Sequence, residues 1–189
     1  MTEPPRKNAL TILLFVIIVI MGAEIVYLTL QNRKLRAAIE DPSNFYRTLQ
    51  SDQRVPELQS PDINGKQVEI RYSDQSPYTL LIWFSPTCHV CEENLSFWTE
   101  LLGAPPSGKL RTLVLCAGSE AEARAYVTQH SFPFPVVSVV DDRLVSAYNG
   151  YVLPQTALIS PQGVIVESWP GALGTAQQDG IRDILKKIK

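Results

Sequence analysis

The residues best suited to chemistry in this chain are two cysteines separated by two residues, in Cys88-His89-Val90-Cys91. They follow an apolar run from Tyr78 to Phe84 and precede a segment with helical periodicity. This order predicts a strand, a turn and a helix, with Cys88 where the helix begins. Unpaired N–H groups and the positive end of the helix dipole stabilise a thiolate there, and the thiolate is the nucleophilic form. We therefore expect disulfide exchange, with Cys88 as the attacking thiol and Cys91 as the resolving one.

Two other interpretations of the cysteine pair are weaker. A zinc site needs four nitrogen or sulfur ligands at characteristic spacings, and Cys116, His89 and His130 do not supply that spacing. A purely structural disulfide across two residues closes almost no loop and restrains the unfolded chain little. The preceding buried strand favours a redox function over both.

The residues beside the pair should tune it. The helix start and a protonated His89 favour the Cys88 thiolate, whereas Glu92 and Glu93 place negative charge nearby. We expect His89 and Glu93 to be tuning residues. Cys116 ends another apolar run, from Leu110, and is expected to be a buried core thiol.

Residues 9–30 predict a membrane anchor. The segment is apolar except for two threonines, a glutamate and a tyrosine, and it reaches the roughly 20 residues needed to span a bilayer. A cleavable signal peptide is the alternative, but its apolar region should be shorter and end in a small-x-small site. Met21-Gly22-Ala23 fits that pattern poorly, so we expect an anchor that is not cleaved.

The anchor divides the 189-residue chain into four parts: a tail (1–8), the anchor (9–30), a juxtamembrane helix and linker (31–54), and a soluble domain (55–189). More Lys and Arg residues follow the anchor than precede it, which by the positive-inside rule would keep the domain in the cytoplasm. Disulfide chemistry favours the oxidising side instead, and we expect an extracytoplasmic, periplasmic-side domain. The net charge of −2 shows no excess of basic residues, so nucleic acid is not the expected partner.

Strands and helices should alternate along the soluble domain. An Asn-Gly turn at residues 62–66 precedes a short strand, and buried strands are expected at 79–84 and 110–116. Helices are expected at 88–102, 120–130 and 181–189, with a short helical turn at 143–148. Further strands are expected at 136–140, after Pro154, and at 164–169. This order indicates an α/β fold with a central mixed sheet and helices on both faces.

Four stretches together resemble the thioredoxin fold, and more closely the TlpA/ResA-like, membrane-anchored thiol–disulfide oxidoreductases with a redoxin or AhpC/TSA-like domain. They are Ser60-Pro61-Asp62-Ile63-Asn64-Gly65-Lys66, Trp83-Phe84-Ser85-Pro86-Thr87-Cys88-His89-Val90-Cys91, Leu153-Pro154-Gln155-Thr156 and Ile159-Ser160-Pro161-Gln162-Gly163. The sequence motif around the cysteines is also similar to that of the MauD-like accessory proteins.

The resemblance implies roles for further residues. Pro154 should be a cis-proline facing the cysteine pair, with the backbone of Leu153 presented to the substrate chain, and Trp83 should contribute to substrate binding. No metal is implied, and the redox-active Cys88–Cys91 pair should serve without a cofactor. The implied partners are a protein disulfide or dithiol, the membrane, and a membrane electron donor.

The sequence departs from the family pattern at three positions. Ile82 stands where thioredoxins have a buried aspartate, and Asn94 stands where ResA-like proteins have an active-site glutamate. Thr87 replaces the usual tryptophan before the first cysteine. The proton path for Cys91 would therefore have to use Glu92, Glu93 or water.

Three classes of function follow. The leading one is an enzyme that reduces disulfides of specific partner proteins outside the cytoplasm. A copper(I) metallochaperone is an alternative, because soft thiolates suit that ion, but the copper-delivering relatives use a different cysteine spacing and a distal histidine. A non-catalytic thioredoxin-like interaction domain is the third, and the intact cysteine pair argues against it.

Overall fold

The structure is a computed structural model that describes residues 6–40, 48–103, 108–132 and 134–188, with side chains of the first segment described for 12–33. Its contacts separate two units, Met1–Tyr46 and Arg47–Lys189. Each is considered by itself.

Within the described residues, the first unit consists of one long helix, α1 (Arg6–Glu40). It includes the predicted anchor and the predicted continuation at 31–40. Within it, Ile12–Arg33 is long and apolar enough to cross a membrane, and the side chains there are exposed. An exposed apolar surface of this length is unfavourable in water, so its composition suits a lipid environment.

The second unit contains seven strands and four helices within the described residues. The strands are β1 (Leu58–Pro61), β2 (Gln67–Ile70), β3 (Tyr78–Phe84), β4 (Leu110–Ala117), β5 (Val136–Val139), β6 (Gln155–Ile159) and β7 (Ile165–Pro170). The helices are α3 (His89–Gly103), α4 (Glu120–Gln129), α5 (Asp142–Ala147) and α6 (Thr175–Ile188).

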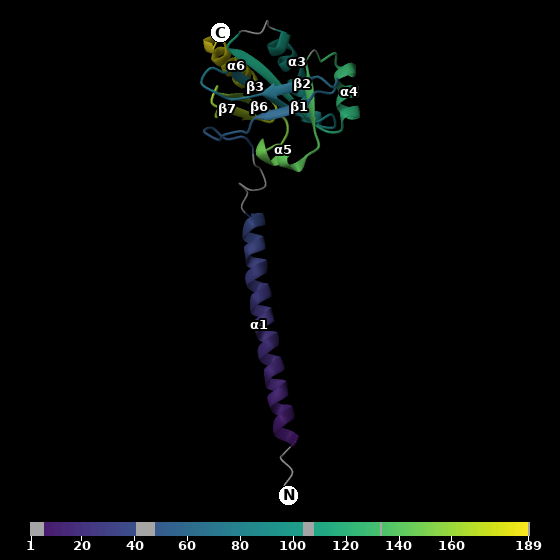
Figure 1. Ribbon diagram of the computed structural model, residues 1–189, viewed down its shortest axis with the longest axis vertical. Coiled ribbons are helices and arrows are strands. Elements are labelled where there is room, and N and C mark those ends of the chain that lie inside the picture. The colour runs from purple at the N-terminus through teal and green to yellow at the C-terminus, as the bar shows by residue number, and fades with distance from the viewer. Residues whose placement is uncertain (1–5, 41–47, 104–107, 133, 189) are drawn as a thin grey trace. The chain divides into compact units, whose positions relative to one another are not determined.

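Five of these strands form one mixed sheet in the order β5-β4-β3-β6-β7. Figure 1 labels β3, β6 and β7 of this sheet. Strands β5, β4 and β3 are parallel, while β6 runs antiparallel to both β3 and β7. The carboxyl ends of β3, β4, β5 and β7 therefore lie at the same edge as the start of β6. Strands β1 and β2 form a separate hairpin.

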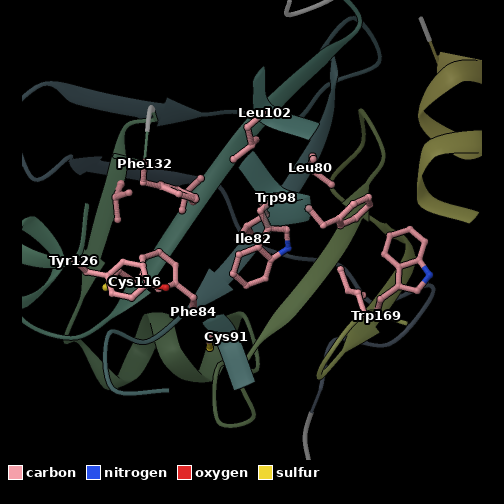
Figure 2. Packing of buried hydrophobic residues seen from close by; sticks show 14 of the residues in the cluster. Leu80, Ile82, Phe84, Cys91, Trp98, Leu102, Cys116, Tyr126, Phe132 and Trp169 are labelled. Carbon is pink, nitrogen blue, oxygen red and sulfur yellow. The ribbon is translucent and has the colours of Figure 1, made fainter. Parts of the chain in front are cut away.

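The central strand β3 is buried on both faces because its alternate residues enter two different clusters. Leu80, Ile82 and Phe84 pack in a cluster with residues of α3, α4 and α6, several of which are drawn in Figure 2. Leu81 and Trp83 pack in the cluster that includes residues of α5 and of the β1–β2 hairpin. The continuous apolar run in the sequence reflects this two-sided burial, and the predicted helix-covered sheet is confirmed.

The expected linker extends too far into the folded domain. Within the expected linker, Leu49 is completely buried in the core. The N–H of Ile165 donates to the carbonyl of Gln53, which ties this segment to β7. The compact unit thus begins before Val55, because contacts remote in sequence outweigh the polar, proline-containing local pattern.

The hairpin turn at 62–66 is present as predicted. Gly65 has φ of +80°, and the Asp62 carboxylate accepts from the N–H groups of Asn64 and Lys66 at 2.8 and 2.9 Å. Helix α6 begins earlier than predicted, at Thr175 instead of Ile181. Its first turns contribute no buried apolar residue, so no apolar stripe marks them in the sequence.

Candidate active site

The cysteine pair lies at the carboxyl end of β3, where the sheet edge meets the start of α3. The Cys88 N–H donates to the Ser85 carbonyl at 3.1 Å, which closes the turn between the two elements. Helix α3 begins at the next residue, His89. Cys88 therefore occupies the position at a helix N-terminus that stabilises a thiolate.

Cys88 and Cys91 form a disulfide, and their environments differ. Cys91 is completely buried, whereas Cys88 is partly exposed. The Cys91 N–H donates to the Cys88 sulfur at 3.2 Å. In the reduced protein this donor would stabilise negative charge on Cys88, the sulfur that an external disulfide can reach. Figure 2 shows Cys91 at the margin of the core cluster.

The two expected tuning residues are both on the surface. His89 Nδ1 lies 3.4 Å from Glu92 Oε2, and the side chains are 89% and 50% exposed. A protonated imidazole would be partly neutralised by this carboxylate, and an exposed pair of this kind contributes about 0–1 kcal/mol. Glu93 is also exposed. These charges adjust the site through solvent, so their individual effects are small.

The turn after β4 packs against the site. A Cβ atom on Gly118 would lie 3.3 Å from Cδ of Pro86, so the glycine allows the Pro86 ring to approach this turn closely. Ser119 then caps α4 in a capping box with Glu122. The Ser119 bonds lower the pKa of the Glu122 carboxyl. Pro86, in the turn before Cys88, is thereby supported by a rigid neighbouring element.

Pro154 and Leu153 precede β6, whose first residue, Gln155, pairs with Trp83 near the end of β3. The Leu153–Pro154 peptide bond is cis, the isomer that the family resemblance implies. Pro154 is buried and Leu153 is partly buried against the core. The register places both residues at the sheet edge that carries the cysteine pair.

The expected role of Trp83 in substrate binding needs correction. Its side chain is completely buried and belongs to the core cluster on the α5 face of the sheet. Its ring lies against the backbone of Gly150 and makes an edge contact with Tyr148, with ring centroids 6.0 Å apart. Alternation along β3 directs Trp83 away from the face that Ile82 and Phe84 occupy. Trp83 thus packs against the backbone of the loop before Pro154.

Asn94 has a structural role that its sequence position did not reveal. It is 1% exposed, and its side chain donates to the Gly171 carbonyl at 2.9 Å and accepts from the Leu173 N–H at 2.7 Å. It therefore clamps α3 to the segment after β7. Ile82 is completely buried in the apolar core. Neither residue is an acid or base, so at these two positions Cys91 has no ionisable neighbour.

Cys116 is a buried free thiol, as predicted. Burial raises the pKa of its thiol to about 12, and the nearby Glu122 carboxylate adds to this effect. At neutral pH the group is therefore protonated and unreactive. Within the described residues, no group of three or more His, Cys, Asp or Glu side chains could hold a metal ion.

The AhpC/TSA family model matches residues 52–168. The chain belongs to this family. Among curated relatives, the thiol-disulfide oxidoreductase ResA of Bacillus thuringiensis is 23% identical over 141 residues, covering 74% of this chain and 79% of the relative. ResA of Bacillus subtilis is 25% identical over 136 residues, covering 71% and 74%.

Solved structures support the fold. StoA from Bacillus subtilis has a TM-score of 0.58 at 16% identity, covering 68% of this chain and 95% of that one. The thioredoxin domain of a thiol-disulfide oxidoreductase from Bacteroides vulgatus has a TM-score of 0.60 at 16% identity, covering 75% and 100%. With the family match and the Cys88–Cys91 pair, the chain is a thioredoxin-like thiol–disulfide oxidoreductase that is similar to ResA.

Proposed function

We propose that this protein is a membrane-anchored reductase that acts on disulfides of specific partner proteins outside the cytoplasm. The observation that carries the proposal is the pairing of a partly exposed Cys88 at a helix N-terminus with a completely buried Cys91. An exposed sulfur can meet a protein disulfide, and a buried one can only act within the molecule.

The reaction proceeds in two exchanges. In the reduced protein the Cys88 thiolate attacks one sulfur of the substrate disulfide, and the other substrate sulfur leaves as a thiolate. The Cys91 thiolate then attacks the Cys88 sulfur, closes the Cys88–Cys91 disulfide and releases the second substrate thiolate. The substrate gains two electrons and takes up two protons, and the protein loses its dithiol.

Proton transfer from Cys91 must use groups near the surface, because Ile82 and Asn94 offer none. Glu92 and Glu93 follow Cys91 on α3 and are exposed, so water can connect them to solvent. We propose that one of these carboxylates, or water alone, accepts the proton as Cys91 becomes the attacking group.

The substrate chain is proposed to dock beside Leu153 and Pro154. The strand register places these residues at the same sheet edge as Cys88. An extended substrate segment could pair with the Leu153 backbone while its disulfide lies against Cys88, as in other cases where a peptide adds to an exposed backbone edge. This arrangement would favour protein disulfides over small ones.

The chemistry and α1 both support the proposed location outside the cytoplasm. The apolar segment Ile12–Arg33 would hold the domain at a membrane, and disulfides are abundant only on the oxidising side. Regeneration of the dithiol then requires a reductant, and we propose a membrane protein that passes electrons through its own dithiol. The family membership is consistent with this cycle.

The proposal is tested by trapping substrates. In cells that express Cys91→Ala, Cys88 should form mixed disulfides that cannot be resolved, so partner proteins should appear as higher bands on non-reducing gels. Cys88→Ala/Cys91→Ala is the matched control and should trap none. Cys116→Ala/Cys91→Ala should trap the same partners. Absence of any Cys88-dependent adduct would refute the proposed exchange.

A further inference from the structure

Gln155, the residue after Pro154, has a buried side-chain amide whose oxygen and nitrogen both form hydrogen bonds. It is 1% exposed. Its Oε1 accepts from the Leu49 N–H at 2.8 Å, and its Nε2 donates to the Asn149 carbonyl at 2.6 Å. One side chain thus connects two segments, here named the entry segment (48–53) and the Pro154 loop (149–154).

Asn149 makes a second connection between the same two segments. Its Nδ2 donates to the Thr48 carbonyl at 3.3 Å and to Gln53 Oε1 at 2.9 Å. Its backbone has φ of +47°, a conformation that asparagine tolerates better than most residues. The entry segment is itself fixed to the sheet, since the Ser168 hydroxyl donates to the Leu49 carbonyl.

Close packing beneath the Pro154 loop leaves it little room to shift. A Cβ atom on Gly150 would lie 2.3 Å from the Trp83 ring, so the loop backbone rests directly on that ring. The Gly150 N–H donates to the Val145 carbonyl at 2.8 Å. Tyr151, in contrast, is 58% exposed, so the loop is packed against Trp83 on one side and open to solvent on the other.

We propose that Gln155 is a positioning residue that holds the Pro154 loop in the geometry needed to dock a protein disulfide, with the entry segment as its brace. This inference rests on the proposed function. A substrate chain that pairs with the Leu153 backbone requires that backbone to be held in place before binding, because ordering it afterwards would reduce affinity. A small disulfide needs only access to Cys88, so it should be insensitive to the brace.

The test compares two Gln→Met substitutions in the full-length protein. Gln155→Met keeps the side-chain length but removes both hydrogen bonds. Gln162→Met makes the same change at the opposite end of β6, where Gln162 is exposed and donates to Asp74 at 3.0 Å. Asn149→Gly is a second variant of the brace that retains access to positive φ.

The first readout is amide hydrogen exchange of the oxidised protein, which does not depend on activity. Gln155→Met and Asn149→Gly should accelerate exchange at 150–153 by about tenfold or more, because each removes hydrogen bonds that hold the loop closed. Gln162→Met should leave these amides unchanged. The central amides of β3 should remain protected in all three variants, which verifies the fold.

The second readout compares two oxidised probes of the reduced protein: a ten-residue peptide with an internal disulfide, and hydroxyethyl disulfide. Gln155→Met should lower kcat/KM for the peptide about tenfold, mainly through KM, with the small probe within twofold. Unchanged exchange at 150–153, or an equal loss with both probes, would overturn the positioning role. If the unmodified protein reduced neither probe but exchange at 150–153 still increased in Gln155→Met, the positioning role would be supported and the proposed function would be refuted.

Discussion

The two sulfurs of the Cys88–Cys91 disulfide differ in exposure, and this difference supports the roles proposed for them. Cys88 is partly exposed and receives a hydrogen bond from the Cys91 N–H at 3.2 Å, whereas Cys91 is completely buried. Cys116 is equally buried but has no sulfur partner. A reactive thiol needs both access and thiolate stabilisation, and Cys88 alone among the three has access.

Cys116 should make the protein less stable at alkaline pH. Burial raises the pKa of its thiol from 9.0 to about 12, so between these values the folded chain keeps a proton that the unfolded chain loses. The folded state then binds more protons, and the free energy of unfolding falls as pH rises, by at most about 1.4 kcal/mol per pH unit. Cys116→Ala should make this decline shallower.

Urea unfolding from about pH 8 to about pH 10 measures the effect. Both proteins should carry Cys88→Ala and Cys91→Ala, which prevents disulfide exchange in the unfolded chain. Burial also raises the pKa of Tyr148, but that contribution is the same in both proteins and cancels in the comparison. Parallel stability curves above pH 9 would contradict a raised Cys116 pKa.

Helix α3 is held against the segment after β7 by a polar clamp, the side-chain amide of Asn94. Asn94 joins the helix to Gly171 and Leu173 across the end of β7, through two hydrogen bonds. The same helix carries Cys91 in its first turn. The orientation of the active-site turn therefore depends on a residue outside it.

Asn94→Leu should destabilise the protein by about 3 kcal/mol, because it leaves the buried Leu173 N–H and the partly buried Gly171 carbonyl without this partner, at about 1–3 kcal/mol each. Ser96→Ala, at an exposed position on the same helix, is the control and should change stability by less than about 0.5 kcal/mol. Urea denaturation gives both values. Equal stability of the two variants would show that the clamp contributes nothing.

The elements that the sequence predicts best are those with a strong local pattern. The apolar run of β3, the Asn-Gly turn at residues 62–66 and the helical spacing of α3 all identify their elements correctly. The sequence predicts a linker at 48–54, because the burial of this segment depends on Gln155, Ser168 and β7, which are remote in sequence. No local pattern shows such contacts.

The site was predictable to the same extent. The cysteine pair and the sheet edge with Pro154 follow from motifs, whereas the clamp at Asn94 and the brace at Gln155 do not. Trp83 shows the opposite error, since its place in a motif suggested substrate contact while strand alternation buries it on the α5 face. Which face a residue occupies depends on the strand register, and a short motif does not specify register.

For the whole molecule, the proposed function requires that α1 is not cleaved and that the domain lies outside the cytoplasm. Alkaline phosphatase fused after Lys189 should be active in a bacterial host, because that enzyme needs disulfides that form only outside the cytoplasm. A green fluorescent protein fusion that folds in the cytoplasm is the control and should be dark if exported. Activity of the cytoplasmic reporter alone, or a mature N-terminus near Glu24, would contradict this arrangement.

The direction of electron flow depends on how strongly the reduced form is stabilised. The helix start, the Cys91 N–H and a protonated His89 stabilise the Cys88 thiolate, while Glu92 and Glu93 oppose it, each by on the order of 1 kcal/mol at such exposed positions. A tenfold change in the equilibrium constant corresponds to about 30 mV for this couple. These effects oppose one another and are similar in size, so they do not place the couple at the strongly oxidising end of the scale, which is consistent with the proposed reductase.

The equilibrium reduction potential of the Cys88–Cys91 couple, measured against glutathione with the full-length protein in detergent, distinguishes a reductant from a disulfide donor. Cys116→Ala should be measured in parallel and should give the same potential. We predict a potential more negative than about −200 mV, toward the thioredoxin value of about −270 mV. A potential near −120 mV, that of the strong oxidant DsbA, would contradict the account and make the protein a disulfide donor.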